Sequence, residues 1–250
     1  MNKIINFKAV KQNCAVCSLS QLCLPRGLNH RALDELEKIV QHEHTLNKGD
    51  VLFQIGQPFK SLYAVQSGSV KVFLPTNDGD EQIVGFHMPG ELFGFDALGH
   101  DEHTCTAVAL ESTRICELPY SKLNAIAMEV PDLRDHFMHL MSNEIADEHT
   151  MMLTLGKKSA EERIAAFLLN LSVRFSKRGF SPNQFNLTMS RHDIGNYLGL
   201  AVETISRCIS HMQDEMIVEA DRKYIRILDM VRLHELAGLR SPDYKQLEKA

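Results

Sequence analysis

Glycines punctuate residues 49–119 at intervals of roughly ten residues, and this pattern constrains the fold more than any other feature of the sequence. Between the glycines lie short runs rich in β-branched and aromatic residues. The runs are VLFQI, SLYAVQ, SVKVFL, EQIVGFH, HTCTAVAL and TRICEL. Short strands separated by regular turn signals are typical of an all-β sandwich or barrel. We therefore expect one antiparallel β domain in this part of the chain.

Residues 120–155 follow a helical period instead. Pro131 can open a fresh helix at its first turn, where a missing N–H costs nothing. Apolar residues then recur three and four positions apart, as in a coiled-coil seam. We expect a second copy of the chain to cover this seam; the alternative is packing against the protein's own domain. The expected interface residues are Phe137, Leu140, Met141, Ile145, Glu148 and Met152.

Residues 190–214 have the pattern of a helix-turn-helix. Ser190 can cap a short first helix, and Gly199 permits the turn into a second helix. The apolar positions on the inner faces are Ile194, Leu198, Ile205 and Ile209. The following VEADRKYIRILD has the alternation of a β-hairpin, which predicts a winged form of the motif.

The outer face of the second helix presents Glu203, Ser206 and Arg207, which lie on one side because they are three and four positions apart. Arginine can bond guanine bidentately, glutamate can accept from cytosine, and serine can bond a base or a phosphate. The alternative is a solvated Glu–Arg pair on an ordinary helix. We expect these three residues to read bases in double-stranded DNA.

Charge and hydropathy indicate which partners and which cellular compartment to expect for this chain. Residues 157–211 hold eight Lys/Arg against four acids, although the whole chain has a net charge of −5. Only the second half is therefore expected to meet a polyanion. No apolar run approaches the ~20 residues that span a bilayer, and the N-terminus lacks a signal peptide's apolar core. We expect a cytoplasmic protein with no membrane partner.

Three cysteines lie within ten positions near the N-terminus, in the pattern Cys14-x2-Cys17-x5-Cys23. In a reducing compartment such a cluster indicates metal or redox chemistry rather than disulfides. The spacing is not that of a zinc finger and is similar to an iron–sulfur arm with uneven gaps. The cysteines that could supply a fourth ligand are Cys105, Cys116 and Cys208. Spacing alone does not choose between the first two.

Together these features resemble the cAMP receptor protein/FNR superfamily of bacterial transcription regulators, and within it the oxygen-responsive FNR group. The resemblance covers nearly the whole chain, including GDVLFQIGQPFKSLYAVQSGSVKVF, GDEQIVGFHMPGELFGFDALG, KKSAEERIAAFLLNLSVRF and RHDIGNYLGLAVETISR. It implies an α+β fold with an N-terminal β-roll (a cyclic-nucleotide-binding-like jelly roll), a long dimerisation helix and a C-terminal winged helix-turn-helix. The implied boundaries are a cysteine-rich arm at 1–27, the β-roll at 28–119, the dimerisation helix at 120–156 and the DNA-binding domain at 157–250.

The resemblance also implies a function. Cys14, Cys17, Cys23 and Cys116 match the four ligands of an oxygen-labile [4Fe–4S] cluster. In this family the cluster promotes a homodimer that binds an inverted repeat under anaerobic conditions, and oxygen degrades the cluster to give inactive monomer.

Other family positions match as well. Glu203, Ser206 and Arg207 match the base-reading residues, which implies TTGAT-like half-sites. Glu148 matches an acidic position on the dimerisation helix, where we expect aspartate in the family. RNA polymerase is an implied partner, with the turn at Asn77–Glu81 as its candidate contact.

Cyclic-nucleotide binders of the superfamily place a glutamate for the ribose hydroxyl and an arginine for the phosphate where this chain has Phe95 and Cys105. Without that cation and that acceptor the main polar contacts are lost. We expect no cyclic nucleotide to bind.

Two alternatives remain at this stage. One is a regulator on the same scaffold that depends on zinc or another effector. The other is an iron–sulfur or thiol enzyme, for which the tetrad His100–His103 could imitate a metal site; we expect that tetrad to be solvated in a loop. Because the sequence has no nucleophile–base motif and no phosphate-binding glycine loop, we predict no enzymatic activity.

Overall fold

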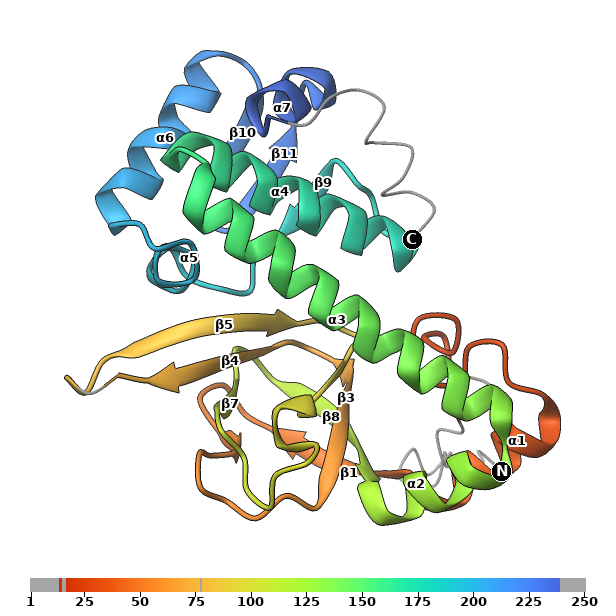
Figure 1. The fold of residues 1–250 in the computed structure, drawn as a ribbon. Coiled ribbons are helices and arrows are strands. Elements are labelled where there is room, and N and C mark those ends of the chain that lie inside the picture. The colour runs from red at the N-terminus through yellow and green to blue at the C-terminus, as the bar shows by residue number, and fades with distance from the viewer. Residues whose placement is uncertain (1–13, 15–16, 77, 239–250) are drawn as a thin grey trace, which may run out of the picture.

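The computed structural model describes residues 14, 17–76 and 78–238. They form two lobes, and the long helix α3 (Pro131–Lys157) runs from the N-terminal lobe to the C-terminal lobe (Figure 1). The N-terminal lobe consists mainly of antiparallel strands, and in the C-terminal lobe helices pack around a small sheet. The predicted α+β fold class, with a β-roll before a winged helix-turn-helix, is confirmed.

Two four-stranded antiparallel sheets build the β-roll, with the strand orders β1-β8-β3-β6 and β2-β7-β4-β5. The strands are β1 (Gln41–Leu46), β2 (Val51–Phe53), β3 (Ser61–Ser67), β4 (Val70–Pro75), β5 (Glu81–His87), β6 (Leu92–Phe93), β7 (Thr106–Ala109) and β8 (Thr113–Pro119). Each of the six predicted runs contains or overlaps one strand. The sequence analysis missed β1 and β6, which have a polar composition and a length of two residues respectively.

The turn between β3 and β4 shows why position 68 must be glycine. Gly68 joins β3 to β4 with φ at 82°, a conformation that other L-residues rarely adopt. A Cβ at this position would lie 2.5 Å from Thr113 Oγ1 and 2.6 Å from the Ser112 carbonyl oxygen. Position 68 therefore needs glycine both for its backbone angle and for the close approach of the neighbouring strand.

The short helix α1 (His30–Ile39) closes one end of the β-roll. Its N-cap is Asn29, whose Oδ1 accepts from the Ala32 N–H at 3.0 Å. Buried leucines from the arm, α1 and the strands form a core with α3 through Leu133, which is fully buried. The start of α3 is thus fixed to the β-roll.

The predicted helical stretch is divided in two. Helix α2 (Tyr120–Glu129) ends at Val130, whose backbone is extended, and Pro131 opens α3. The expectation that Pro131 starts a fresh helix is confirmed.

The C-terminal lobe contains α4 (Ala160–Lys177), β9 (Gln184–Asn186), α5 (Arg191–Leu198), α6 (Val202–Asp214), β10 (Val218–Asp221), β11 (Tyr224–Ile227) and α7 (Met230–Leu236). The predicted hairpin is β10–β11, and β9 adds a third strand in the order β10-β11-β9. The sequence analysis missed β9, because its three residues lie in a loop rich in Gly, Pro and Asn. A capping box of Ser159 and Glu162 begins α4.

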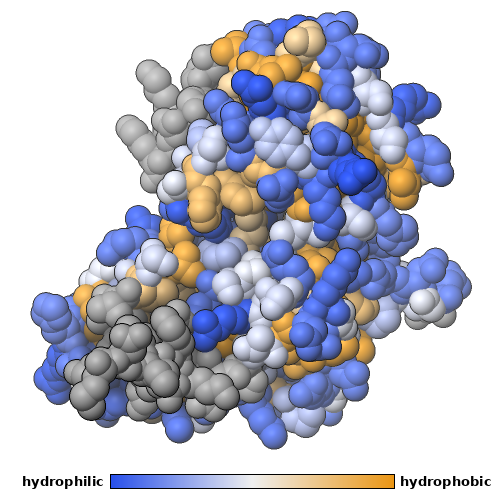
Figure 2. All heavy atoms as spheres, turned by 180° about the vertical axis from the view of Figure 1, so that it is seen from behind, coloured by the Kyte–Doolittle hydropathy of each residue, from blue (hydrophilic) through white to orange (hydrophobic). Residues whose placement is uncertain are grey.

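The two lobes share one hydrophobic core. Ile83 and Phe86 of β5 belong to the same buried cluster as the apolar faces of α4 and α5. The Phe86 ring lies 5.1 Å from that of Tyr197 in α5 and 6.3 Å from that of Phe167 in α4. Seen from behind, the surface of both lobes is mainly hydrophilic, with hydrophobic side chains in separate patches (Figure 2).

The expectation of a solvated tetrad at residues 100–103 is wrong for His103. Its side chain is buried, with 3% of the residue exposed. The imidazole stacks on Phe53 at 3.8 Å between ring centroids, and its Nδ1 lies 3.3 Å from the Asp96 Oδ1. The sequence could not show that the loop folds back onto an aromatic core.

Candidate cluster pocket and nucleic-acid interface

Four cysteines line a single pocket in the N-terminal lobe. Cys14, Cys17 and Cys23 come from the arm, and Cys116 comes from β8. Most of the other lining side chains are aliphatic, from the arm, α1 and β3. Cys105 does not line this pocket, because it is buried in a separate cluster of the β-roll. The fold thus brings together thiols that are about 100 residues apart in the sequence.

Burial controls the ionisation of these thiols. It raises the pKa of Cys14 well above its ordinary value, and the Glu37 carboxylate adds to the shift. Burial likewise raises the pKa of Cys23 to about 12 and that of Cys116 to about 11. The three thiols are therefore protonated near neutral pH, and a cation would have to displace their protons to gain thiolate ligands.

Glu37 of α1 also fixes the backbone of the arm. The Cys14 N–H donates to the Glu37 Oε2 at 2.6 Å. This bond places the first cysteine of the arm beside α1. The sequence analysis did not single out Glu37, since one acidic residue on a helix has no distinctive signal.

The donor set fits an iron–sulfur cluster in kind and number, because such clusters are held by four thiolates in a shielded site. Among the described residues, however, no group of three or more His, Cys, Asp or Glu side chains could hold a metal ion as they stand.

Helix α3 exposes a regular row of apolar side chains. Met138, Ile145 and Met152 are seven positions apart and have exposed fractions of 57%, 52% and 70%. Met141 and Glu148 lie between them, which gives the alternating spacing of three and four that a coiled-coil seam requires. Glu148 is exposed.

Two of the predicted interface residues also contact the protein's own core. Phe137 and Leu140 are partly buried against the β-roll cluster that includes Leu133. The Phe137 ring lies 6.0 Å from that of Phe95. Met138, which the sequence analysis passed over, has the exposed position next to Phe137.

The helix-turn-helix has the predicted geometry. Ser190 and Asp193 form a capping box at the start of α5. Gly199 makes the turn with φ at 62°, and Ile205 and Ile209 of α6 are buried. The sequence analysis missed the role of Gly195, where an added Cβ would lie 2.6 Å from the Leu200 carbonyl oxygen.

The three predicted base-reading residues share the free face of α6. Glu203, Ser206 and Arg207 are all exposed. The Ser206 Oγ donates to the Val202 carbonyl at 3.0 Å, and its lone pairs can still accept a hydrogen bond. This face is long enough and free enough to enter a major groove.

The turn proposed for RNA polymerase is described in part. Asn77 lies outside the described residues, and residues 78–80 are exposed at the tip of the β4–β5 hairpin. Glu81, the first residue of β5 after this turn, forms an ion pair with Lys71.

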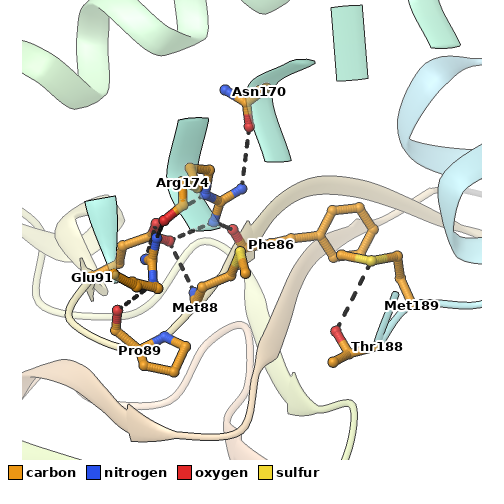
Figure 3. Close-up of polar contacts among 9 residues, drawn as sticks. Phe86, Met88, Pro89, Glu91, Asn170, Arg174, Thr188 and Met189 are labelled. Carbon is orange, nitrogen blue, oxygen red and sulfur yellow. Dashed lines mark hydrogen bonds and ion pairs between the residues drawn. The ribbon is translucent and has the colours of Figure 1, made fainter. Parts of the chain in front are cut away.

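An ion cluster that the sequence analysis missed joins the lobes (Figure 3). The Glu91 carboxylate lies between Arg174 and Arg178 of the α4 region, with N–O distances of 2.5 Å to each. Burial alone would raise the pKa of Glu91, but the two guanidinium groups outweigh it and hold the pKa at about 2. No local pattern signals a contact between residues more than 80 positions apart.

Among the helices that the structure describes, none has a stretch both long and apolar enough to cross a membrane.

Comparison with known proteins places both lobes in known families. Residues 43–129 match the cyclic nucleotide-binding domain, and residues 162–236 match the Crp-like helix-turn-helix domain. FixK2 from Bradyrhizobium japonicum has a similar structure, with a TM-score of 0.74 and 29% identity. That likeness covers 81% of this chain and 100% of FixK2.

Curated relatives extend the likeness to the sequence as a whole. The chain is 51% identical to the fumarate and nitrate reduction regulatory protein of Vibrio cholerae serotype O1, over 91% of each protein. It is 49% identical to the transcriptional activator protein FnrA of Stutzerimonas stutzeri, over 95% of this chain and 98% of FnrA. These relatives are transcription regulators rather than enzymes. The chain therefore belongs to the FNR group of the Crp/FNR family of transcription regulators.

Proposed function

We propose that the protein is an oxygen-responsive transcription regulator. A [4Fe–4S] cluster held by Cys14, Cys17, Cys23 and Cys116 promotes dimerisation and binding to an inverted repeat in DNA. Loss of the cluster to oxygen returns the protein to an inactive monomer. The observation that carries this proposal is that four thiols from two distant segments line one largely apolar pocket.

When bound, the cluster supplies an iron core that takes four thiolates and reacts with oxygen. Ligation by all four cysteines would join the arm to β8. Cys23 and Cys116 also pack against the cluster of buried residues that contains Leu133 of α3. A change at the thiols can therefore reach the start of α3 through direct contacts.

The exposed row on α3 provides the dimer seam. Pairing of two copies about a two-fold axis would bury Met138, Ile145 and Met152 of each chain. The same pairing would bring each Glu148 toward its mate. Two like charges 4 Å apart repel by about 4 kcal/mol at an effective dielectric constant of 20. We propose that this repulsion keeps the cluster-free protein monomeric.

Each subunit would read one half-site through Glu203, Ser206 and Arg207 of α6. The two recognition helices of a dimer engage half-sites one helical turn apart. A TTGAT-like half-site and a contact between the β4–β5 hairpin and RNA polymerase complete the proposal. Such a regulator would act in the cytoplasm, where the DNA is.

We propose further that no cyclic nucleotide controls this protein. Cys105 stands where a nucleotide-binding relative would need a cation. Asp96 lies beside Cys105 and contributes to raising the pKa of that thiol, after burial. Burial of Asp96 is outweighed by hydrogen bonds, chiefly from His103, so its pKa is lowered. A nucleotide phosphate at this place would meet a carboxylate rather than a guanidinium group.

The alternative of zinc or another effector on the same scaffold makes a different prediction. Anaerobically purified protein should show the broad visible absorbance of an iron–sulfur cluster and should retard DNA with an inverted repeat. Both properties should disappear together on exposure to air. Colourless protein that contains zinc and binds DNA equally well in air would refute the oxygen-responsive function.

A further inference from the structure

We propose that Asn196 is a positioning residue that ties the helix-turn-helix to the β-roll and so sets which spacing between half-sites the dimer accepts. The proposal rests on the proposed function, because it assumes that two subunits read one inverted repeat.

The observation is a side chain that takes the place of a strand. β5 is the edge strand of its sheet and pairs with β4 on one side only. On β5, the Ile83 N–H donates to the Asn196 Oδ1 at 2.5 Å. The Asn196 Nδ2 donates to the Glu81 carbonyl at 2.5 Å. One carboxamide thus satisfies a backbone donor and a backbone acceptor two residues apart, as a neighbouring strand would do.

Further contacts hold α5 against the β-roll at this place. The Gln82 Nε2 donates to the Asn196 carbonyl at 2.8 Å. The Lys71 Nζ lies 3.3 Å from the Asp193 Oδ1, and both side chains are mostly shielded from solvent. Beneath these polar contacts the Phe86 and Tyr197 rings pack together. A polar rim over an apolar centre is the arrangement of a specific interface.

This interface is rigidly linked to the recognition helix. The Leu200 N–H donates to the Gly195 carbonyl at 2.8 Å across the turn, and Ile205 packs in the core that α5 and β5 share. The orientation of α6 therefore follows the orientation of α5 on β5. Because α3 is fixed to the same β-roll, the contact at Asn196 relates the reading face to the dimer axis.

The docked arrangement leaves the reading face uncovered. Glu203, Ser206 and Arg207 remain exposed with α5 in place. The likeness to FixK2 spans both lobes together, since it covers all of that chain at a TM-score of 0.74. Docking of α5 on β5 therefore leaves the reading face of the recognition helix free.

The test uses full-length, cluster-loaded protein and a set of inverted repeats whose spacers differ by one and two base pairs. We expect wild type to prefer one spacer by at least tenfold. Asn196→Ala should lose about tenfold in affinity for that spacer and less than threefold for the others, so that the preference flattens. Affinity for a single half-site should stay within twofold. Asn183→Ala, the same change at an exposed position of the same lobe, should match wild type.

A second measurement does not use DNA. Hydrogen exchange at the Ile83 amide should be slow in wild type and at least tenfold faster in Asn196→Ala. Gln82→Ala removes an exposed side chain that donates to the Asn196 and Ile83 carbonyls, so it should fold normally and flatten the spacer preference less.

Three results would overturn the inference. They are an equal loss of affinity at every spacer, an unchanged preference in Asn196→Ala, and a wild type that binds all spacers equally. Wild type that binds no inverted repeat at all would instead refute the proposed function.

Discussion

The DNA-reading end and the cysteine-lined end of this molecule are built in different ways. At the DNA-reading end, capping boxes at Ser159 and Ser190 begin the helices, the core is closed, and three reading residues share one exposed face. At the other end, which we propose to be the sensing end, four thiols line one pocket. The reading end is thus formed by neighbouring elements of one lobe, whereas the four thiols come from two distant segments, the arm and β8, and reach one pocket only through the fold of the N-terminal lobe.

The largest expected effect concerns the ion cluster that joins the two lobes. Glu91→Gln should lower the free energy of unfolding by about 3 kcal/mol, because Arg174 and Arg178 would lose their counter-charge in a largely buried site. Chemical denaturation measures this, and Glu102→Gln at an exposed position is the control.

The same contact sets a dependence on pH. The pKa of Glu91 in the folded protein, about 2, is below its ordinary value of 4.5. Its stabilising contribution is therefore fully present above pH 4.5 and is lost as the pH falls toward 2. Wild type should lose stability in this window more steeply than Glu91→Gln, and parallel curves would show that the ion cluster joins the lobes only weakly.

Removal of one thiol should disable the sensing end and leave the reading end folded. Cys116→Ser should lower anaerobic affinity for an inverted repeat by at least about a hundredfold, because a lone subunit loses the linked second contact. Cys105→Ser is the matched control, since Cys105 lies outside the pocket. If both variants bind DNA like wild type in anoxic titrations, the pocket does not control the reading end.

Loss of the proposed base-reading arginine on α6 should weaken DNA binding and leave the cysteine-lined pocket unchanged. Arg207→Ala should cost roughly 1–3 kcal/mol of DNA-binding free energy and relax the preference at one base pair. The visible absorbance and the mass of the protein should not change. Fluorescence anisotropy with a set of single-base variants of the half-site gives the answer, and a uniform loss across all variants would make Arg207 a phosphate contact instead.

The smallest of these effects is expected at the proposed dimer seam, the exposed apolar row on α3. Glu148→Ala should strengthen self-association in air by about tenfold, since it removes like charges that would face each other in the proposed dimer. Glu129→Ala, at the end of α2 and away from the seam, is the control. A variant that remains as monomeric as wild type in sedimentation velocity would exclude Glu148 as the barrier to pairing.

Much of this architecture could be predicted because its signals are local. The strand β5 coincides with the run EQIVGFH, and the Asn29 cap, the Pro131 restart and the Gly199 turn appear where their residue types indicate. Each of these features depends on a few neighbouring residues, so a pattern in the sequence is enough to place it.

The features that were missed depend on contacts between distant residues. Glu91 with Arg174, and Asn196 with the edge of β5, join segments that are more than 80 positions apart. Phe137 and Leu140 fit the helical stripe as well as Met138 does, and only the position of the β-roll shows that they also contact the protein's own core. His103 is buried because its loop packs against an aromatic core. Spacing along the chain has no information about such tertiary packing.

The most direct test of the central claim is the mass of the protein in solution with and without its cluster. Sedimentation equilibrium under strict anoxia should give a dimer for the cluster-loaded protein at concentrations where the metal-stripped protein is a monomer. Equal association of the two forms would contradict the claim that the four thiols control pairing.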